Sequence, residues 1–445
     1  MRITFYGGAR SVTGANYLLE HNGLRILVDC GLHQGSKYAE DLNYEKFQYD
    51  PIGIQFAFLT HSHIDHVGRF PKLYRDGFRG TLYATDASAD LMAIALPDNM
   101  SHITREAVSD GHSPLFEQKD LDGLMNLVKG VAYNETIDLG QGVAARLYDA
   151  GHVLGSAIVE ISWTQSSDDG ARKRIFFSGD LGNPPTPLLQ PTEFIHDADY
   201  LVIESAYGDR VHEAREERRE RLAHVITETI KRNGTLMIPS FALERTQELL
   251  VELKGLLGEG KIPSVPMFLD SPLAIKLTGV YEKYLGTSPF DFPGIKFTAT
   301  PDESKRINNV PPPKIIIAGS GMSQGGRILH HELRYLSDSK STILFVGYQV
   351  DGSLGRRIQK GDTEVSIFGE RIKVSCRVET ISGYSAHADQ PSLLHWIKIA
   401  QTNNRLKKVF VVQGEEASSK TLANLVHDTL GITAIVPKTG ESWEL

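Results

Sequence analysis

The stretch that most constrains the fold is residues 56–68, FAFLTHSHIDHVG. Its first five residues are apolar or β-favouring, which predicts a buried strand, and four side chains able to bind a metal follow at once. These are His61, His63, Asp65 and His66. In an extended turn, side chains two positions apart project to the same side, so the first two histidines can hold one ion. The carboxylate and the third histidine are displaced by the turn and are expected to face a neighbouring ion.

The ligand types at this strand end limit the chemistry. Imidazole and carboxylate without thiolate suit zinc or manganese at a catalytic site better than a closed structural cysteine site. A histidine-rich surface loop is the alternative interpretation, and an isolated His-x-His pair would not decide between the two. The full pattern behind a buried strand favours the metal site.

Length and composition exclude several classes of protein. The chain has 445 residues, which favours two domains over one core. Apolar residues make up 41% and charged residues 23%, as in globular proteins, and no apolar run is long enough for a membrane span. With no export signal and 2 cysteines, we expect a cytoplasmic protein without disulfides and no membrane partner. The net charge of -8 argues against non-specific coating of nucleic acid but allows a local basic groove.

The order of the expected elements predicts an α/β protein in which one domain interrupts another. From residue 212 a charged helix precedes a stretch where strands alternate with helices, which indicates βαβ units and a parallel sheet. Near residue 380 the regular alternation of strands and helices ends and the pattern of the first part of the chain returns, so we expect the end of the chain to complete the first domain. Before the insertion we expect strands at 2–6, 16–20, 24–28, 56–60, 143–149, 157–163, 174–178 and 198–204, with helices at 81–97 and 116–128.

Other strand ends offer further ligands for a metal centre. His152 follows the strand expected at 143–149, between two glycines, and Asp180 follows the strand expected at 174–178. A carboxylate at such a place could bridge two ions about 3.5–4 Å apart. Each residue alone would more often be a turn residue, but the histidine cluster favours the ligand interpretation for both.

Three more side chains are candidates around this centre. Glu204 ends a predicted strand and is paired with His387, which lies in SGYSAHADQ, as acid/base candidates. A carboxylate beside the histidine would raise its pKa and keep it protonated as a general acid. Asp29 also ends a strand, and we assign it a supporting role, either orienting a ligand or capping backbone amides.

Substrate-binding candidates lie outside the centre. The hydroxyls and amides of Ser385 and Ser320 are in glycine-flanked turns and could contact phosphates, although ordinary turn serines are an equally open interpretation. Four arginines are candidates for a basic path along a nucleic-acid strand: Arg245, Arg327, Arg356 and Arg357. The adjacent pair is favoured, while a surface arginine is the default interpretation of each.

The order of motifs resembles the metallo-β-lactamase fold in its β-CASP branch, which comprises nucleases related to the endonuclease of the cleavage and polyadenylation machinery. The similar stretches cover almost the whole chain. They are GGARSVTGANYLLE, HSHIDHVGRFP, AGHVLGSA, FSGDLGN, LVIESAYGDR, FALERTQELL, LDSPLA, GSGMSQGGRILHH and GYSAHAD.

This resemblance implies an αββα sandwich formed by residues 1–206 and 379–445, with an inserted β-CASP domain at 207–378 and a substrate site between the two. It also implies two zinc ions. The first would be held by His61, His63 and His152, the second by Asp65 and His66, with Asp180 bridging, Glu204 as the acid of motif A and His387 as the histidine of motif B.

One position departs from the family's pattern. RNA-processing members carry a histidine after the last core strand, in a stretch resembling VHGE, where this chain has Gln413 in FVVQGEE. An amide can offer only its neutral carbonyl oxygen, so Gln413 would be a weak ligand. The second site should then be weaker or prefer manganese. DNA-repair members of the branch also lack this histidine.

The predicted function is hydrolysis of phosphodiester bonds in single-stranded RNA, in processing or decay, with His387 protonating the leaving 3′-oxygen. The alternatives are a DNA nuclease, a hydrolase of small esters or thioesters on the same fold, and an RNA-binding module with turnover impaired by Gln413. The large inserted domain favours a polymer over a small substrate. Endonucleolytic or 5′-exonucleolytic action, and a monomer or a homodimer, both remain open.

Overall fold

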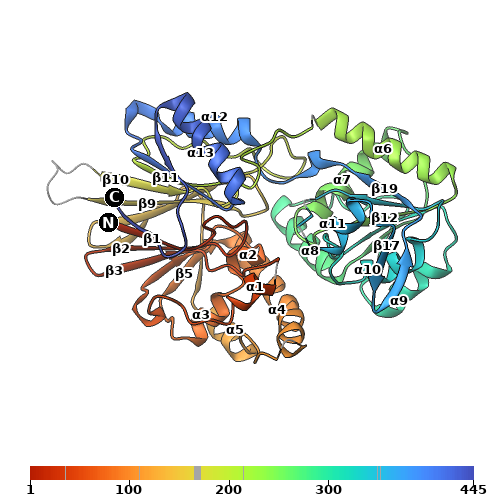
Figure 1. The fold of residues 1–445 in the computed structure, drawn as a ribbon, viewed down its shortest axis with the longest axis horizontal. Coiled ribbons are helices and arrows are strands. Elements are labelled where there is room, and N and C mark those ends of the chain that lie inside the picture. The colour runs from red at the N-terminus through yellow and green to blue at the C-terminus, as the bar shows by residue number, and fades with distance from the viewer. Residues whose placement is uncertain (36, 110, 165–171, 214, 348, 351) are drawn as a thin grey trace. The chain divides into compact units, whose positions relative to one another are not determined.

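The chain forms two compact units in a computed structural model that describes residues 1–35, 37–109, 111–164, 172–213, 215–347, 349–350 and 352–445. The first unit contains Met1–Val211 and His387–Leu445, and the second contains His212–Ala386 (Figure 1). The predicted α/β class with a parallel sheet is confirmed. The predicted domain limits, after residues 206 and 378, stay a prediction. None of the described helices is long and apolar enough to cross a membrane.

Two seven-stranded sheets form the first unit. The first sheet has the order β22-β1-β2-β3-β4-β5-β6, in which β3 to β6 run parallel to one another. Its strands are β1 (Arg2–Gly7), β2 (Asn16–His21), β3 (Leu24–Val28), β4 (Phe56–Phe58), β5 (Thr81–Thr85), β6 (Val128–Val131) and β22 (Ser442–Glu444).

The second sheet has the order β21-β20-β11-β10-β9-β8-β7, in which β21 to β10 run parallel to one another and β10 to β7 pair antiparallel. Its strands are β7 (Ile137–Gly140), β8 (Val143–Asp149), β9 (Ala157–Thr164), β10 (Arg172–Phe177), β11 (Tyr200–Glu204), β20 (Lys408–Val412) and β21 (Thr433–Ile435). The strands β20 and β21 come from the end of the chain, so the chain returns to the first unit after it has passed through the second.

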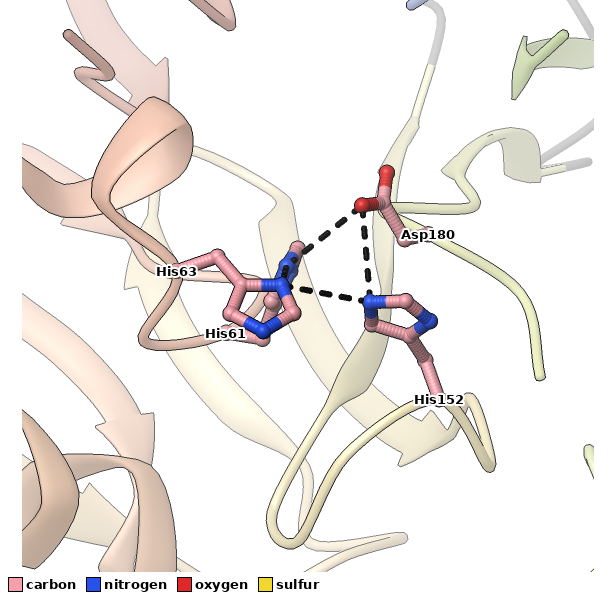
Figure 2. A group of neighbouring side chains, drawn as sticks. All are labelled: His61, His63, His152 and Asp180. Atoms are coloured by element: carbon pink, nitrogen blue, oxygen red, sulfur yellow. Dashed lines mark hydrogen bonds and ion pairs between the residues drawn. The ribbon is translucent and has the colours of Figure 1, made fainter. Parts of the chain in front are cut away.

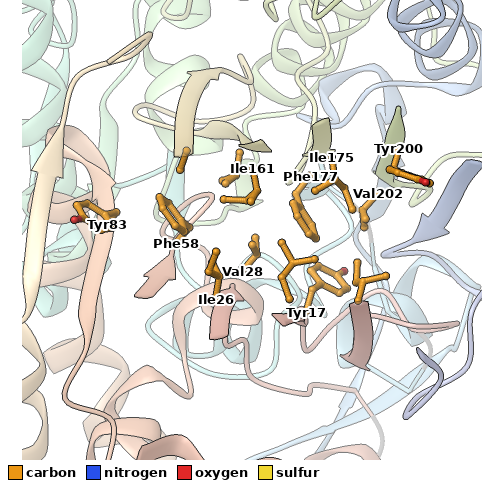
Figure 3. Packing of buried hydrophobic residues seen from close by; sticks show 14 of the residues in the cluster. Tyr17, Ile26, Val28, Phe58, Tyr83, Ile161, Ile175, Phe177, Tyr200 and Val202 are labelled. Atoms are coloured by element: carbon orange, nitrogen blue, oxygen red, sulfur yellow. The ribbon is translucent and has the colours of Figure 1, made fainter. Parts of the chain in front are cut away.

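The core of the first unit lies between its two sheets (Figure 3). Alternate residues of each strand enter it, because successive side chains of a strand project to opposite faces. In β8 and β9 these are Val143, Ala145, Leu147, Ala157, Val159, Ile161 and Trp163. The other face of each sheet packs against helices. The second sheet is covered by α12 (Gln390–Ala400) and α13 (Glu416–Leu430), and the first by α3 (Phe70–Arg75), α4 (Asp86–Ser109) and α5 (Gln118–Met125). The predicted αββα sandwich is therefore confirmed.

The first unit has seven α-helices among the described residues. They are α1 (Lys37–Asp41), α2 (Ile64–Val67), α3 (Phe70–Arg75), α4 (Asp86–Ser109), α5 (Gln118–Met125), α12 (Gln390–Ala400) and α13 (Glu416–Leu430). Of these, α2 carries two of the predicted ligands, Asp65 and His66. The predicted helix at 81–97 was wrong over its first five residues, which form β5. Leu82 pairs there with Ala57 and Val128, and such long-range pairing leaves no trace in local periodicity.

The second unit is built around a parallel six-stranded sheet with the order β14-β13-β15-β12-β16-β19. Every residue of β12 and β15 is buried, as expected for strands covered on both faces. The strands are β12 (Thr235–Pro239), β13 (Met267–Asp270), β14 (Ile295–Phe297), β15 (Lys314–Ala318), β16 (Thr342–Phe345) and β19 (Arg377–Thr380), with a separate hairpin of β17 (Glu364–Ile367) and β18 (Glu370–Lys373). The helices are α6 (Arg215–Lys231), α7 (Arg245–Gly258), α8 (Pro272–Leu285), α9 (Pro301–Arg306), α10 (Ile328–Tyr335) and α11 (Leu354–Gln359).

A buried carboxyl on α10 gives the second unit a stability that depends on pH. Glu332 accepts one hydrogen bond from the hydroxyl of Ser323, and its other oxygen has no hydrogen-bond partner among the described residues. Burial raises the pKa of Glu332 to about 8, against the opposing effect of the Ser323 hydrogen bond. An unfolded glutamate titrates near about 4.3. Between these values the folded chain holds the proton more tightly, so stability must fall as pH rises.

The Glu332→Gln chain is expected to lose this pH dependence, because a neutral amide can still accept the Ser323 hydrogen bond but does not titrate. In the parent, the free energy of unfolding should fall by at most about 1.4 kcal/mol per pH unit between about pH 4.3 and pH 8. Urea-dependent hydrogen exchange of peptides from α10 at several pH values measures it. Glu370→Gln, at an exposed position of the same unit, is the control. Equal slopes in parent and Glu332→Gln would contradict the prediction.

Candidate metal centre

The four side chains of the centre come from three strand ends of the first unit. His61 and His63 follow β4, and His63 precedes the first turn of α2. His152 lies in the loop between β8 and β9, where its backbone N–H donates to the Ser156 hydroxyl. Asp180 follows β10. The structure therefore brings together residues that are up to about 120 positions apart in the sequence, as residues 61 and 180 show.

The donor atoms of these residues enclose a small volume (Figure 2). The Nδ1 atom of His63 lies 3.0 Å from Nε2 of His61 and 3.3 Å from Nε2 of His152. One oxygen of Asp180, Oδ2, lies 3.5 Å from His61 Nε2 and 3.6 Å from His152 Nε2. Three imidazoles and one carboxylate thus point at a common centre.

These separations fit a tetrahedral zinc site. Bonds of about 2.0–2.1 Å in tetrahedral geometry place the ligand atoms about 3.3–3.4 Å apart, and the observed separations lie on both sides of that value. The donors are also of the right type, since nitrogen and carboxylate oxygen without sulfur are typical of catalytic zinc. Without a cation, three imidazoles this close together would leave lone pairs or N–H groups facing one another. The residues present therefore fit a metal.

Close backbone contact holds the loops of His152 and Asp180 together. A Cβ atom at Gly182 would lie 2.0 Å from the carbonyl oxygen of Gly151, so only a glycine allows the two loops to approach this far. The backbone N–H of Gly182 also donates to the carbonyl of Ala150. The spacing of the two donors is thus fixed by backbone packing rather than by their side chains alone.

The charge of Asp180 suits a ligand. Burial alone would raise the pKa of this carboxyl, but the imidazoles of His66, His387 and His61 hold it well below its usual range. The side chain is only 4% exposed. Asp180 is therefore ionised and turned toward the histidines.

The remaining ligand candidates, Asp65 and His66, lie on α2 beside this group. Nε2 of His66 is 3.4 Å from Oδ1 of Asp180 and 3.8 Å from a carboxylate oxygen of Asp65. Asp29 accepts from the Thr60 backbone N–H and hydroxyl and lies 2.8 Å from Nδ1 of His66. Asp29 thus orients a histidine and caps a backbone amide at the same time, the two roles considered for it from the sequence.

The side chain of Gln413 is turned differently from the prediction. The sequence suggested that its carbonyl oxygen would face a second metal, but this oxygen accepts a hydrogen bond from the hydroxyl of Tyr17 at 3.4 Å. The amide nitrogen lies 3.1 Å from Nε2 of His66 and donates to the carbonyl of Val12 at 3.0 Å. The nitrogen, which cannot bind a metal, is therefore the atom beside the ligand candidates.

Glu204 and His387 form the predicted pair. Nδ1 of His387 lies 3.1 Å from one carboxylate oxygen of Glu204, whose other oxygen accepts from the backbone N–H of Leu181 at 2.6 Å. Burial alone would lower the pKa of His387, but the carboxylates of Glu204 and Asp180 raise it to about 9. About a quarter of its side chain, 26%, is exposed. His387 therefore carries a proton at neutral pH and can reach a ligand from solvent.

The substrate-binding candidates belong to the second unit. Ser385 is buried and Ser320 is partly exposed. Arg356 donates to Gln359, and Arg357 pairs with Asp362. Their contact with a substrate stays a prediction. The two other arginines have structural partners, since Arg245 is buried against Glu248 and Arg327 donates to Asp270.

Two contributors to the site were missed in the sequence. Thr60 joins Asp29 to the histidines through its hydroxyl, and its position next to His61 could have suggested this. Tyr17 contacts Gln413, from a strand about 400 positions away in the sequence. Its inward position in β2 could be anticipated from strand alternation, but its partner could not.

Three family models match the chain in succession. They are described as a metallo-beta-lactamase superfamily domain over residues 18–169, a Beta-Casp domain over 246–358, and a Zn-dependent metallo-hydrolase RNA specificity domain over 371–437. Together they match both units.

Two curated proteins and one solved structure show how far the similarity extends. Ribonuclease TTHA0252 of Thermus thermophilus is 36% identical over 439 residues, which is 96% of each chain. Transcription termination factor FttA of Methanosarcina mazei is 30% identical over 97% of this chain and 70% of its own length. A protein of unknown function from Enterococcus faecalis has the same fold, with a TM-score of 0.58 at 14% identity over 100% of this chain and 99% of the other.

Proposed function

Since this chain belongs to the β-CASP family of the metallo-β-lactamase superfamily, we propose that it is a metal-dependent ribonuclease that hydrolyses phosphodiester bonds in single-stranded RNA. The observation that carries the proposal is the four-donor group of His61, His63, His152 and Asp180, whose spacing fits one catalytic metal. The family model for RNA specificity over residues 371–437 supports RNA as the substrate class.

Zinc is the metal that we propose for this group, because tetrahedral nitrogen and oxygen donors with bonds near 2.0 Å are what zinc prefers. When bound, such an ion polarises a phosphate oxygen and lowers the pKa of a water to about 7. Imidazoles bind a metal in their neutral form, and Asp180 is ionised, so the group would place one negative charge against the dication. A second ion on Asp65 and His66, predicted from the sequence, depends on the surroundings of His66.

Proton transfer is assigned to His387. Because Nδ1 is engaged by Glu204, the ring orientation is fixed and Nε2 is the nitrogen that donates to the leaving oxygen. The buried carboxylate of Glu204 acts through His387 and does not contact substrate. Protonation of the 3′-oxygen by His387 would leave a 5′-phosphate on the other product.

The finer predictions from the sequence are part of this proposal. Ser320, Ser385, Arg356 and Arg357 are proposed to contact the RNA strand, and the protein is proposed to act in the cytoplasm. Monomeric and homodimeric action, and cleavage within or from the end of the strand, fit this chemistry equally.

Cleavage of end-labelled RNA tests the function. The chain is stripped with a chelator, then reloaded with zinc or manganese, and offered single-stranded RNA, DNA of the same sequence and a small aryl ester. We expect RNA cleavage by the reloaded chain and none by the stripped chain. Hydrolysis of DNA or ester in preference to RNA would overturn the substrate assignment, and RNA cleavage that persists in the stripped chain would overturn the metal dependence.

A further inference from the structure

We propose that the centre holds a single metal ion, because Gln413 is the hydrogen-bond partner of His66 in the place where a second ion would bind. This inference rests on the proposed function only in assuming a metal at the four-donor group. A single ion differs from the two ions expected from the sequence. Gln413 is then the residue that determines how many metal ions the centre binds.

The backbone fixes the position of Gln413. The residue follows β20, which runs parallel to β11 with Val412 beside Glu204. Its backbone N–H donates to the carbonyl of Gly8 at 2.7 Å, and its side chain is buried. A Cβ atom at Gly8 would lie 2.1 Å from the amide oxygen of Gln413. The amide is thus packed tightly against the loop after β1.

The neighbouring groups also determine which end of the Gln413 amide is the nitrogen and which is the oxygen. The atom beside Val12 faces a backbone carbonyl at 3.0 Å, and two oxygens at that distance would repel with no proton between them. This atom must therefore be the nitrogen. The oxygen then lies toward the Tyr17 hydroxyl, which can donate to it. The contact with Val12 and the contact with Tyr17 therefore require the same orientation of the amide group.

The orientation of Gln413 decides which atom of its amide lies beside His66. An amide nitrogen can only donate, and it lies 3.1 Å from Nε2 of His66, on the side where a second ion would have to approach. Nδ1 of His66 lies 2.8 Å from a carboxylate oxygen of Asp29. Both ring nitrogens of His66 therefore have polar neighbours, and the Gln413 amide nitrogen, which cannot bind a metal, lies beside Nε2.

The donors around His66 do not gather about one point as those of the four-donor group do. Among the described residues, two groups of three or more donors lie within 4.8 Å of one another, and neither includes Asp65 or His66. Binding there would require the Gln413 amide to turn over, which would break its contacts with Val12 and Tyr17 and bring its oxygen against the Val12 carbonyl. Gln413 therefore keeps His66 as a supporting residue of α2 rather than a ligand.

Zinc content per chain tests the inference separately from catalysis. The stripped full-length chain is saturated with zinc, freed of unbound metal by gel filtration, and analysed for zinc by mass spectrometry. We expect one zinc in the parent, one in Asp65→Asn, and about two in Gln413→His, where an imidazole replaces the amide. Asp65→Asn keeps the shape of the side chain and lies at a partly exposed position, so it supplies a readout even if Gln413→His does not fold.

Two zinc ions in the parent, or a loss of zinc in Asp65→Asn, would overturn the inference and leave the proposed function standing. Zinc content of zero in the parent would overturn the metal centre of the proposed function as well. A folded Gln413→His chain that still holds a single zinc would also overturn the assignment of Gln413 as the residue that sets the number. RNA cleavage is measured on the same samples, so loss of activity alone is not mistaken for loss of metal.

Discussion

The His63→Ala chain is expected to lose metal-dependent RNA cleavage by about 10³-fold or more, because a catalytic metal contributes several kcal/mol and each 1.36 kcal/mol corresponds to about tenfold in rate. Nδ1 of His63 is the atom nearest to the donors of both other histidines in the group, at 3.0 and 3.3 Å. Three donors remain after its removal, and a tetrahedral site missing a protein ligand binds its ion much more weakly.

The fold should survive this change, since His63 is partly exposed and its removal leaves no cavity in the core. Initial cleavage rates of labelled RNA and zinc content measure the effect, and circular dichroism checks the fold. His196→Ala, which removes an exposed histidine of the same unit, is the control and should behave as the parent. Unchanged turnover in folded His63→Ala would exclude the four-donor group as the reaction site.

Replacing His387 by alanine is expected to slow cleavage by about 10²–10⁴-fold, the usual contribution of a general acid, with little change in zinc content. The reason is geometric. His387 is held through Nδ1 by Glu204 at 3.1 Å and lies 3.7 Å from Asp180, beside the centre but outside the four-donor group. Its removal leaves the three other histidines in place.

Two readouts separate this role from a ligand role. Single-turnover cleavage rates at saturating RNA report the chemical step, and zinc content reports binding of the ion. His395→Ala, on an exposed face of α12, is the matched control. If His387→Ala lost its zinc along with activity, His387 would be a ligand rather than a proton donor. The group of Asp180, Glu204 and His387, whose donors also lie close together, is where that ion would bind.

Local sequence patterns predicted the strands around the site well where neighbouring residues along the chain determine the strand. The strand before His61 and the strands before His152, Asp180 and Glu204 all end within three residues of their predicted limits. Each was marked by apolar or β-branched residues followed by a polar turn with glycine. The error at residues 81–85 has the opposite cause, since these residues form a strand because β4 and β6 lie on either side of them.

The arginines show the same limit at the level of side chains. Arg245 was a candidate for an exposed basic path, yet it is buried with Glu248 and lies over the ring of Tyr384. A charged residue in a sequence favours exposure, because burial is tolerated only when a partner of opposite charge is brought close. That partner was three residues along the same helix, so spacing alone could have suggested the pair.

The sequence by itself determined the fold class and the family, because residue type and order along the chain carry that information, while the metal ligands and the domain limits stay predictions. Only the tertiary structure decided how the donors are combined. The amide of Gln413 faces His66 with its nitrogen because Val12 and Tyr17, both distant in sequence, offer an acceptor on one side and a donor on the other. Hydrogen-bond direction depends on all partners at once, and these meet only when the chain has folded.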